Sequence, residues 1–89
     1  MPGKFPLGRT VITANAKDTL FPADIPTALS RHAAGDWGDV DEHDRQANES
    51  ALRNQSRVFS AYHDRNMVKF WIITEADRSA TTVLLPEDY

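Results

Sequence analysis

The sequence has 89 residues, 40% of them hydrophobic and 26% charged, which is enough for one small domain with a single core. Its net charge of −3 argues against general nucleic-acid binding, because such proteins need a basic surface to displace counterions from phosphate. The absence of cysteine excludes disulfide scaffolds, thiolate zinc sites and thiol nucleophiles.

The N-terminal stretch begins with residues 1–8, which carry two prolines and two glycines and predict an irregular arm. Residues 9–13 are short and β-branched. They predict either an edge strand of a C-terminal sheet or a lead into the next element. Residues 15–21 can form one helical turn with Asn15 as its cap, which Pro22 would then end.

A first helix is predicted over residues 25–34, because apolar residues recur there at helical spacing. Asp24 can cap its start, and Pro26 is tolerated in the first turn, where its missing N–H has no intrahelical partner. Gly35 supplies the C-terminal stop, since glycine adopts the left-handed conformation freely.

A second helix is predicted over residues 41–54, whose acidic first turn suits the helix dipole. Pairs four residues apart, Asp41 with Arg45 and Glu49 with Arg53, would each add a few tenths of a kcal/mol. The apolar stripe is thin, so this helix should lie on the surface with a narrow inward face formed by Val40, Ala47, Ala51 and Leu52.

The last third of the chain predicts a three-stranded antiparallel meander. Residues 58–62 and 67–74 are rich in β-branched and aromatic side chains, and a third such run lies between Ser79 and Pro86. Both faces of the middle strand are apolar, because Phe70 and Ile72 alternate with Trp71 and Ile73. One face should pack on the helices, and the other needs the N-terminal arm, a partner subunit or a ligand.

The densest polar cluster contains the types of side chain that bind divalent metals. Its members are His32, Asp36, Asp39, Asp41, Glu42, His43 and Asp44. Its spacing fails the calcium-loop pattern, so the favoured interpretation is an acidic helix N-terminus. His32 lies near a helix C-terminus, where the dipole and Asp36 favour a protonated imidazole with a structural role.

The polar segment 75–79 offers a second candidate site. Its charged side chains could meet a partner, or they could bind a metal for phosphodiester hydrolysis together with His32 and Asp36. The favoured interpretation is a solvated turn with a local pair between Asp77 and Arg78. Trp37 and Trp71 could be interface anchors, but in a chain of this size core positions are favoured.

Three stretches of the sequence stand out as motifs: Gly-Asp-Trp-Gly-Asp-Val at residues 35–40, Trp-Ile-Ile-Thr-Glu-Ala-Asp-Arg-Ser at residues 71–79, and Leu-Leu-Pro-Glu-Asp-Tyr at residues 84–89. Together with Arg31-His32 and Ser60-Ala61-Tyr62, they resemble a family of small bacterial proteins that are often encoded on plasmids and other mobile or accessory DNA. The family has no established activity, so the resemblance implies no catalytic or binding residues.

We therefore predict a single α+β domain over residues 1–89, with two short helices packed on a three-stranded antiparallel meander. It comprises the arm at 1–8, a mainly helical half at 9–54 and the meander at 57–89. No apolar run approaches the roughly 20 residues of a membrane helix, and no signal peptide is expected, so we expect a cytoplasmic protein.

The leading function hypothesis is a non-catalytic protein-binding module that acts through a protein partner or as a homodimer. The alternative is a small metal-dependent hydrolase or nuclease. No metal and no cofactor is expected, and nucleic acid is disfavoured as a partner. The candidate binding residues are His32, Asp36, Trp37, Asp39, Glu75, Asp77 and Arg78.

Overall fold

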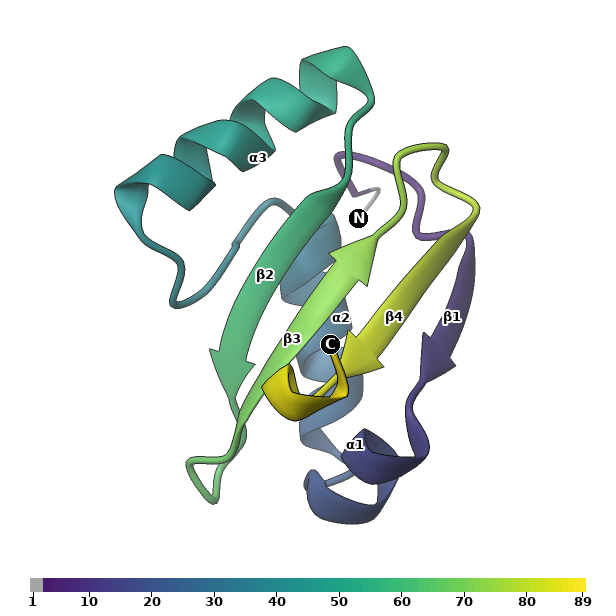
Figure 1. Ribbon diagram of the computed structural model, residues 1–89, viewed down its shortest axis with the longest axis vertical. Helices are drawn as coiled ribbons and strands as arrows, with labels where there is room; N and C mark the ends of the chain where they lie inside the picture. Colours follow the sequence, from purple (N-terminus) through teal and green to yellow (C-terminus); the bar gives the residue numbers. More distant parts are fainter. Residues whose placement is uncertain (1–2) are drawn as a thin grey trace.

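The computed structural model describes residues 3–89 and shows an α+β fold (Figure 1). The class is as predicted, and the short N-terminal strand that the sequence left open is present, so these residues form four strands; they form three α-helices instead of the predicted two. In chain order the elements are β1 (Arg9–Ile12), α1 (Ala14–Thr19), α2 (Asp24–Ala33), α3 (Glu42–Asn54), β2 (Val58–His63), β3 (Lys69–Thr74), β4 (Ala80–Leu84) and the 3-10 helix η1 (Pro86–Asp88).

The sheet has the strand order β1-β4-β3-β2. Strands β2, β3 and β4 form the predicted antiparallel meander, and β1 pairs in parallel with β4 at one edge. The N-terminal strand is thus an edge strand, the first of the two alternatives that residues 9–13 left open. The predicted arm is irregular from residue 3 onward, and its first two residues lie outside the described part of the chain.

The sheet has an inner and an outer face, fixed by the alternation of side chains along each strand. Helices α1 and α2 pack behind the inner face, whereas only η1 and the C-terminal residue lie in front of the outer face, with α3 beside β2 (Figure 1). The main core joins the inner face to α1 and α2, and its members are Ala16, Leu20, Ala28, Tyr62, Phe70, Ile72, Val83 and Leu85.

The N-terminal ends of α1 and α2 differ from the prediction. Thr13, and not Asn15, caps α1, and its hydroxyl accepts a hydrogen bond from the Ala16 N–H at 3.1 Å. Helix α2 begins at Asp24 without a side-chain cap. The Asp24 carboxylate instead accepts three hydrogen bonds from Arg65, one from its backbone N–H at 2.8 Å and two from its guanidinium at 2.8 Å and 3.2 Å. A partner distant in sequence has therefore replaced a local cap.

Helix α3 keeps its predicted extent, with Asp41 as the cap residue that accepts from the Asp44 N–H at 2.8 Å. Because Asp41 is used in this way, Arg45 pairs with Glu42, and the predicted Asp41–Arg45 pair does not form. The inward face also differs from the prediction, because Ala47 is exposed and Asn48 is buried.

The free edge of β2 is covered by groups from two other segments. The Asn48 side-chain amide accepts from the Phe59 N–H at 3.0 Å and donates to the Phe59 carbonyl at 2.6 Å. The loop before α3 supplies backbone groups, since the Ala61 N–H donates to the Trp37 carbonyl and the Asp39 N–H donates to the Ala61 carbonyl. These contacts leave little of the edge open for pairing with another strand.

Candidate functional site

Three aromatic rings lie in a row on the outer face of the sheet, and we call them the aromatic row: Phe59, Trp71 and Tyr89. The Phe59 and Trp71 ring centroids are 5.1 Å apart at an interplanar angle of 74°, and those of Trp71 and Tyr89 are 5.8 Å apart at 72°. Both contacts have the edge-to-face geometry that aromatic pairs prefer. Phe59 and Trp71 are half-buried, and Tyr89 is 69% exposed.

The position of Tyr89 is set by the chain just before it. The Asp88 carboxylate accepts hydrogen bonds from the Thr13 hydroxyl at 2.7 Å, the Asn15 amide at 3.1 Å and the Leu85 N–H at 3.0 Å. These bonds, that from Thr13 above all, lower the pKa of Asp88. They fasten η1 to the sheet, so that the last ring comes to lie against Trp71.

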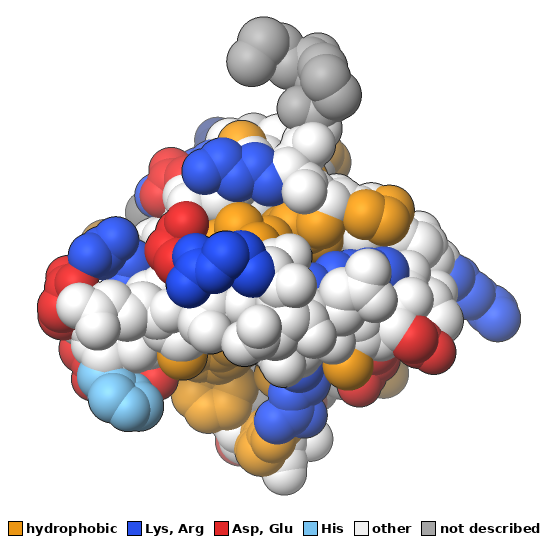
Figure 2. Space-filling view, turned by 90° about the horizontal axis from the view of Figure 1, so that it is seen from above, with side chains coloured by type: hydrophobic (Ala, Val, Ile, Leu, Met, Phe, Trp, Pro, Cys, Tyr) orange, Lys and Arg blue, Asp and Glu red, His pale blue; other side chains and the backbone are white. Residues whose placement is uncertain are grey.

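Basic side chains surround the aromatic row. Arg57 donates a hydrogen bond to the Tyr89 hydroxyl at 3.1 Å, and its guanidinium carbon lies 5.9 Å from the centre of that ring. The strand registers place Arg9 and Lys69 on the same face, and both are exposed. On the side of the outer face, at the lower edge of Figure 2, basic and hydrophobic side chains lie next to one another. The surface thus has an aromatic centre with Arg57 and Lys69 beside it, and Arg9 lies on the same face at the β1 edge.

His32 does not reach this surface. Its side chain is completely buried, with the Phe5 and Trp37 rings at centroid distances of 5.2 Å and 5.8 Å. Burial, aided by the positive charge of Arg78, lowers the pKa of His32 to about 4, so the imidazole is neutral at pH 7. The predicted protonated imidazole is therefore wrong, because desolvation outweighs the helix dipole and Asp36 pairs with Arg31 instead.

A chain of four hydrogen bonds, three of them buried, fixes the tautomer of His32. The Thr81 hydroxyl donates to the Leu7 carbonyl at 2.7 Å, so it must accept from Thr74, 2.7 Å away. The Thr74 hydroxyl has then used its only proton, and it accepts from His32 Nε2 at 2.9 Å. His32 Nδ1 is left as the acceptor for Ser60. This chain of hydrogen bonds, which we call the relay, joins α2 to three strands. Its four side chains, His32, Ser60, Thr74 and Thr81, are buried, so a substrate cannot reach them.

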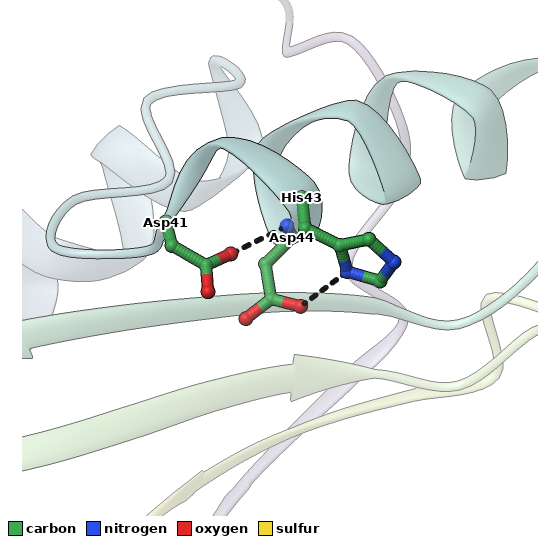
Figure 3. Close-up of side chains that lie close together, drawn as sticks. All are labelled: Asp41, His43 and Asp44. Atoms are coloured by element: carbon green, nitrogen blue, oxygen red, sulfur yellow. Dashed lines mark hydrogen bonds and ion pairs between the residues drawn. The ribbon is translucent and has the colours of Figure 1, made fainter.

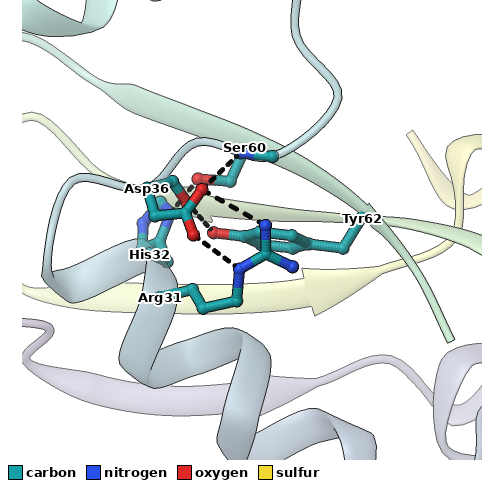
Figure 4. Close-up of polar contacts among 6 residues, drawn as sticks. Arg31, His32, Asp36, Ser60 and Tyr62 are labelled. Carbon is teal, nitrogen blue, oxygen red and sulfur yellow. Dashed lines mark hydrogen bonds and ion pairs between the residues drawn. The ribbon is translucent and has the colours of Figure 1, made fainter.

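Asp36 and Asp39 belong to the exposed loop between α2 and α3. The Asp36 carboxylate accepts two hydrogen bonds from Arg31, at 2.7 Å and 3.2 Å, and its backbone carbonyl accepts from the Tyr62 hydroxyl (Figure 4). The Arg31 bond accounts for most of the lowering of the pKa of Asp36. Asp39 lies 2.7 Å from Nδ1 of His63 on β2. Both carboxylates thus fasten their loop to neighbouring elements.

Trp37 lies in the core. It is 4% exposed, and its indole N–H donates to the Glu49 carboxylate at 2.9 Å. That bond occupies Glu49, and the predicted pair between Glu49 and Arg53 is not formed. A partner can therefore reach this ring only if the loop opens.

The turn between β3 and β4 contains the remaining candidate residues. Asp77 accepts from the Ser79 N–H at 2.9 Å. The Ser79 side chain, followed by this backbone bond, lowers the pKa of the Asp77 carboxyl group. The predicted pair between Asp77 and Arg78 is absent from this turn. Arg78 is half-buried and donates to the carbonyls of Ala51 and Ser56, at the end of α3 and just beyond it. Of the candidate residues in this turn, Glu75 and Asp77 are exposed.

The structure brings together three members of the predicted polar cluster, but not the ligands that the hydrolase hypothesis needs. Within residues 3–89, one group of three carboxylate or imidazole side chains has ligand atoms within 4.8 Å of one another, and it consists of Asp41, His43 and Asp44 (Figure 3). Neither Asp36 nor the 75–79 turn contributes to it. Helix capping by Asp41 and a 3.6 Å contact between His43 and Asp44 account for this group.

Of the aromatic row, the sequence indicated only Trp71 as a candidate interface anchor, and it favoured a core position for that residue. The alternation of β2 and β3 does place Phe59 and Trp71 on one face, so two of its three rings could have been found by combining the strands. The sequence carries no comparable signal for Tyr89, because its contact with Trp71 depends on how η1 folds back.

Comparison with known proteins does not assign this chain to a family. No family model, no curated protein and no solved structure matches the chain. Over residues 3–89, none of the helices combines the length and the apolar composition that crossing a bilayer requires.

Proposed function

We propose that this chain is a small non-catalytic protein-binding module that docks a protein partner on the outer face of its sheet. The observation that carries the proposal is the aromatic row, which no α-helix of residues 3–89 covers and which ends in a tyrosine that is 69% exposed. Aromatic side chains dominate the binding energy of protein interfaces, because they bury a large area at a small cost in side-chain entropy.

The charges of this surface favour a partner with an acidic border around an apolar centre. Arg57 and Lys69 are exposed beside the aromatic row and Arg9 is exposed on the same face at the β1 edge, although the whole chain has a net charge of −3. Three other arginines are neutralised by Asp24, Glu42 and Asp36. Three dispersed cations give a weak electrostatic attraction to a nucleic-acid backbone, so an acidic protein surface is the better match.

The alternative, a metal-dependent hydrolase, receives less support from the geometry. It requires Asp36 to meet Glu75 or Asp77 around a shared cation with His32 nearby. His32 is instead buried and bonded to Ser60 and Thr74, and Asp36 is bonded to Arg31.

Affinity capture from a lysate of the native host tests the proposal. Tyr89→Ala should reduce the amount of retained partner by about tenfold or more, because a hot-spot aromatic contributes about 2 kcal/mol. Tyr89→Phe keeps the ring and should retain most binding. His43→Ala changes a side chain that is 91% exposed on α3 and should retain all of it.

Two results would count against this proposal. Equal retention by Tyr89→Ala and the wild type would show that the aromatic row is not the docking surface. Loss of the partner after nuclease treatment of the lysate would show that the retained component binds through nucleic acid. Circular dichroism on each variant shows whether it is folded, and so distinguishes loss of the docking surface from loss of the fold.

A further inference from the structure

The two edges of the sheet differ in how their backbone groups are satisfied. The β2 edge is covered at Phe59 by Asn48 and at Ala61 by the loop before α3. Strand β1 forms the other edge, and Figure 1 shows no element beyond it. The molecule therefore protects one edge against pairing and leaves the other open.

The outward-facing groups of β1 can be identified from its bonds to β4. The Arg9 and Thr13 N–H groups donate to the carbonyls of Ser79 and Val83, each at 3.0 Å. The alternation of a strand then turns the N–H and C=O groups of Thr10 and Ile12 away from β4. Within residues 3–89 these four groups have no hydrogen-bond partner.

We propose that two copies of this chain pair through β1 in an antiparallel arrangement, with a two-fold axis at Val11. Thr10 of each copy then lies opposite Ile12 of the other, and all four outward groups of each strand are bonded. A register centred on Thr10 would pair Ile12 with Gly8, and one centred on Ile12 would pair Thr10 with Ala14, the first residue of α1. Of these three registers, only the one centred on Val11 pairs both Thr10 and Ile12 with residues of the other copy's β1.

Side chains support the second copy as the occupant of this edge. Val11 is one of the large hydrophobic side chains that the described part of the chain exposes, at 37%, and on the axis it would pack against its own counterpart. Arg9 would lie opposite Thr13 of the second copy, whose hydroxyl is bonded to the Asp88 carboxylate. Each copy thus places a cation beside an anion of the other, and no like charges face each other.

The arrangement has a consequence for the outer face. A two-fold axis within paired antiparallel strands runs perpendicular to the sheet, so the four strands of each copy join in one continuous sheet with both outer faces on the same side. Two aromatic rows would then face one direction. The pairing itself goes beyond partner docking and does not depend on it.

Sedimentation equilibrium of the full chain tests the pairing. The wild type should show twice the 10.0 kDa mass of a single chain. Val11→Lys and Val11→Glu should each be monomeric, because the axis brings two like charges face to face. An equimolar mixture of these two variants should return to the dimer mass, since lysine then faces glutamate.

Met67 provides the matched control, because it is another exposed hydrophobic residue, at 74%, and lies in the turn between β2 and β3. Met67→Lys should sediment like the wild type. A wild type that is monomeric at a chain concentration of about 1 mM would overturn the proposal. Its Kd would then lie above about 1 mM, which corresponds to an association free energy of only about 4 kcal/mol. It would also be overturned by a dimer that survives in both Val11 variants, or by a mixture that stays monomeric.

Discussion

Gly38→Ala is expected to lower the free energy of unfolding by about 4 kcal/mol, most of the stability of a domain of this size. Gly38 has a φ of +73°, which disfavours any residue with a Cβ. The added methyl group would overlap the Ala61 carbonyl oxygen and approach Cδ1 of the Tyr62 ring to 2.6 Å. Relief of the overlap would separate the loop from β2 and break the backbone bonds at Ala61.

Gly35→Ala supplies the control for backbone conformation. Gly35 also has a positive φ, +83°, but a methyl group there would meet only the flexible Lys4 side chain. We expect a loss of about 1 kcal/mol, which is the cost of the left-handed conformation alone. Urea denaturation of both variants measures the difference, and equal losses would show that the loop does not depend on its close contact with β2.

Acidification between pH 6.5 and 4 is expected to reduce the free energy of unfolding by about 3 kcal/mol through His32 alone. The unfolded chain binds a proton at His32 near pH 6.5, whereas the folded chain binds it only near pH 4, because burial removes the water that would stabilise the charged imidazole. Above pH 6.5 both states are neutral and this contribution to stability is complete. As the pH falls, the unfolded state is favoured by about 1.4 kcal/mol per pH unit until the folded state is protonated as well.

His32→Gln should remove this slope between pH 6.5 and 4.5, although the variant should be about 2 kcal/mol less stable at pH 7 because the relay loses hydrogen bonds. His43→Gln replaces an imidazole that is 91% exposed and should keep the slope. The measurement is urea denaturation at half-unit pH intervals. A wild-type stability that is flat over this range would contradict the buried, neutral His32.

Local elements were predictable from the sequence because their signals are local. The extent of α3 followed from its acidic first turn and helical spacing, and the meander followed from alternating apolar residues around polar turns. Parallel pairing of β1 with β4 was not predictable, because the two strands are about 70 residues apart and no turn sets their register.

The roles of individual polar residues depended on partners distant in sequence. Asp24 is of a residue type that is favoured at helix N-caps, but its carboxylate bonds to Arg65, 41 residues away. His32 lies at a helix end that favours a charge, but Ser60 and Thr74 bury it as a neutral group. In both cases tertiary contacts outweigh a local preference worth about 1 kcal/mol. For the same reason most of the selected site residues hold loops in place, and the open aromatic surface lies elsewhere.

The most direct test of the proposed docking surface uses the two tryptophans as internal probes. Trp37 is buried and its indole N–H is bonded to Glu49, whereas Trp71 is half-buried in the centre of the aromatic row. In a 15N NMR titration with the partner captured from lysate, the Trp71 indole signal should shift or broaden and the Trp37 signal should stay in place. A shift of Trp37 and the 36–39 loop with no change at Trp71 would contradict docking on the outer face.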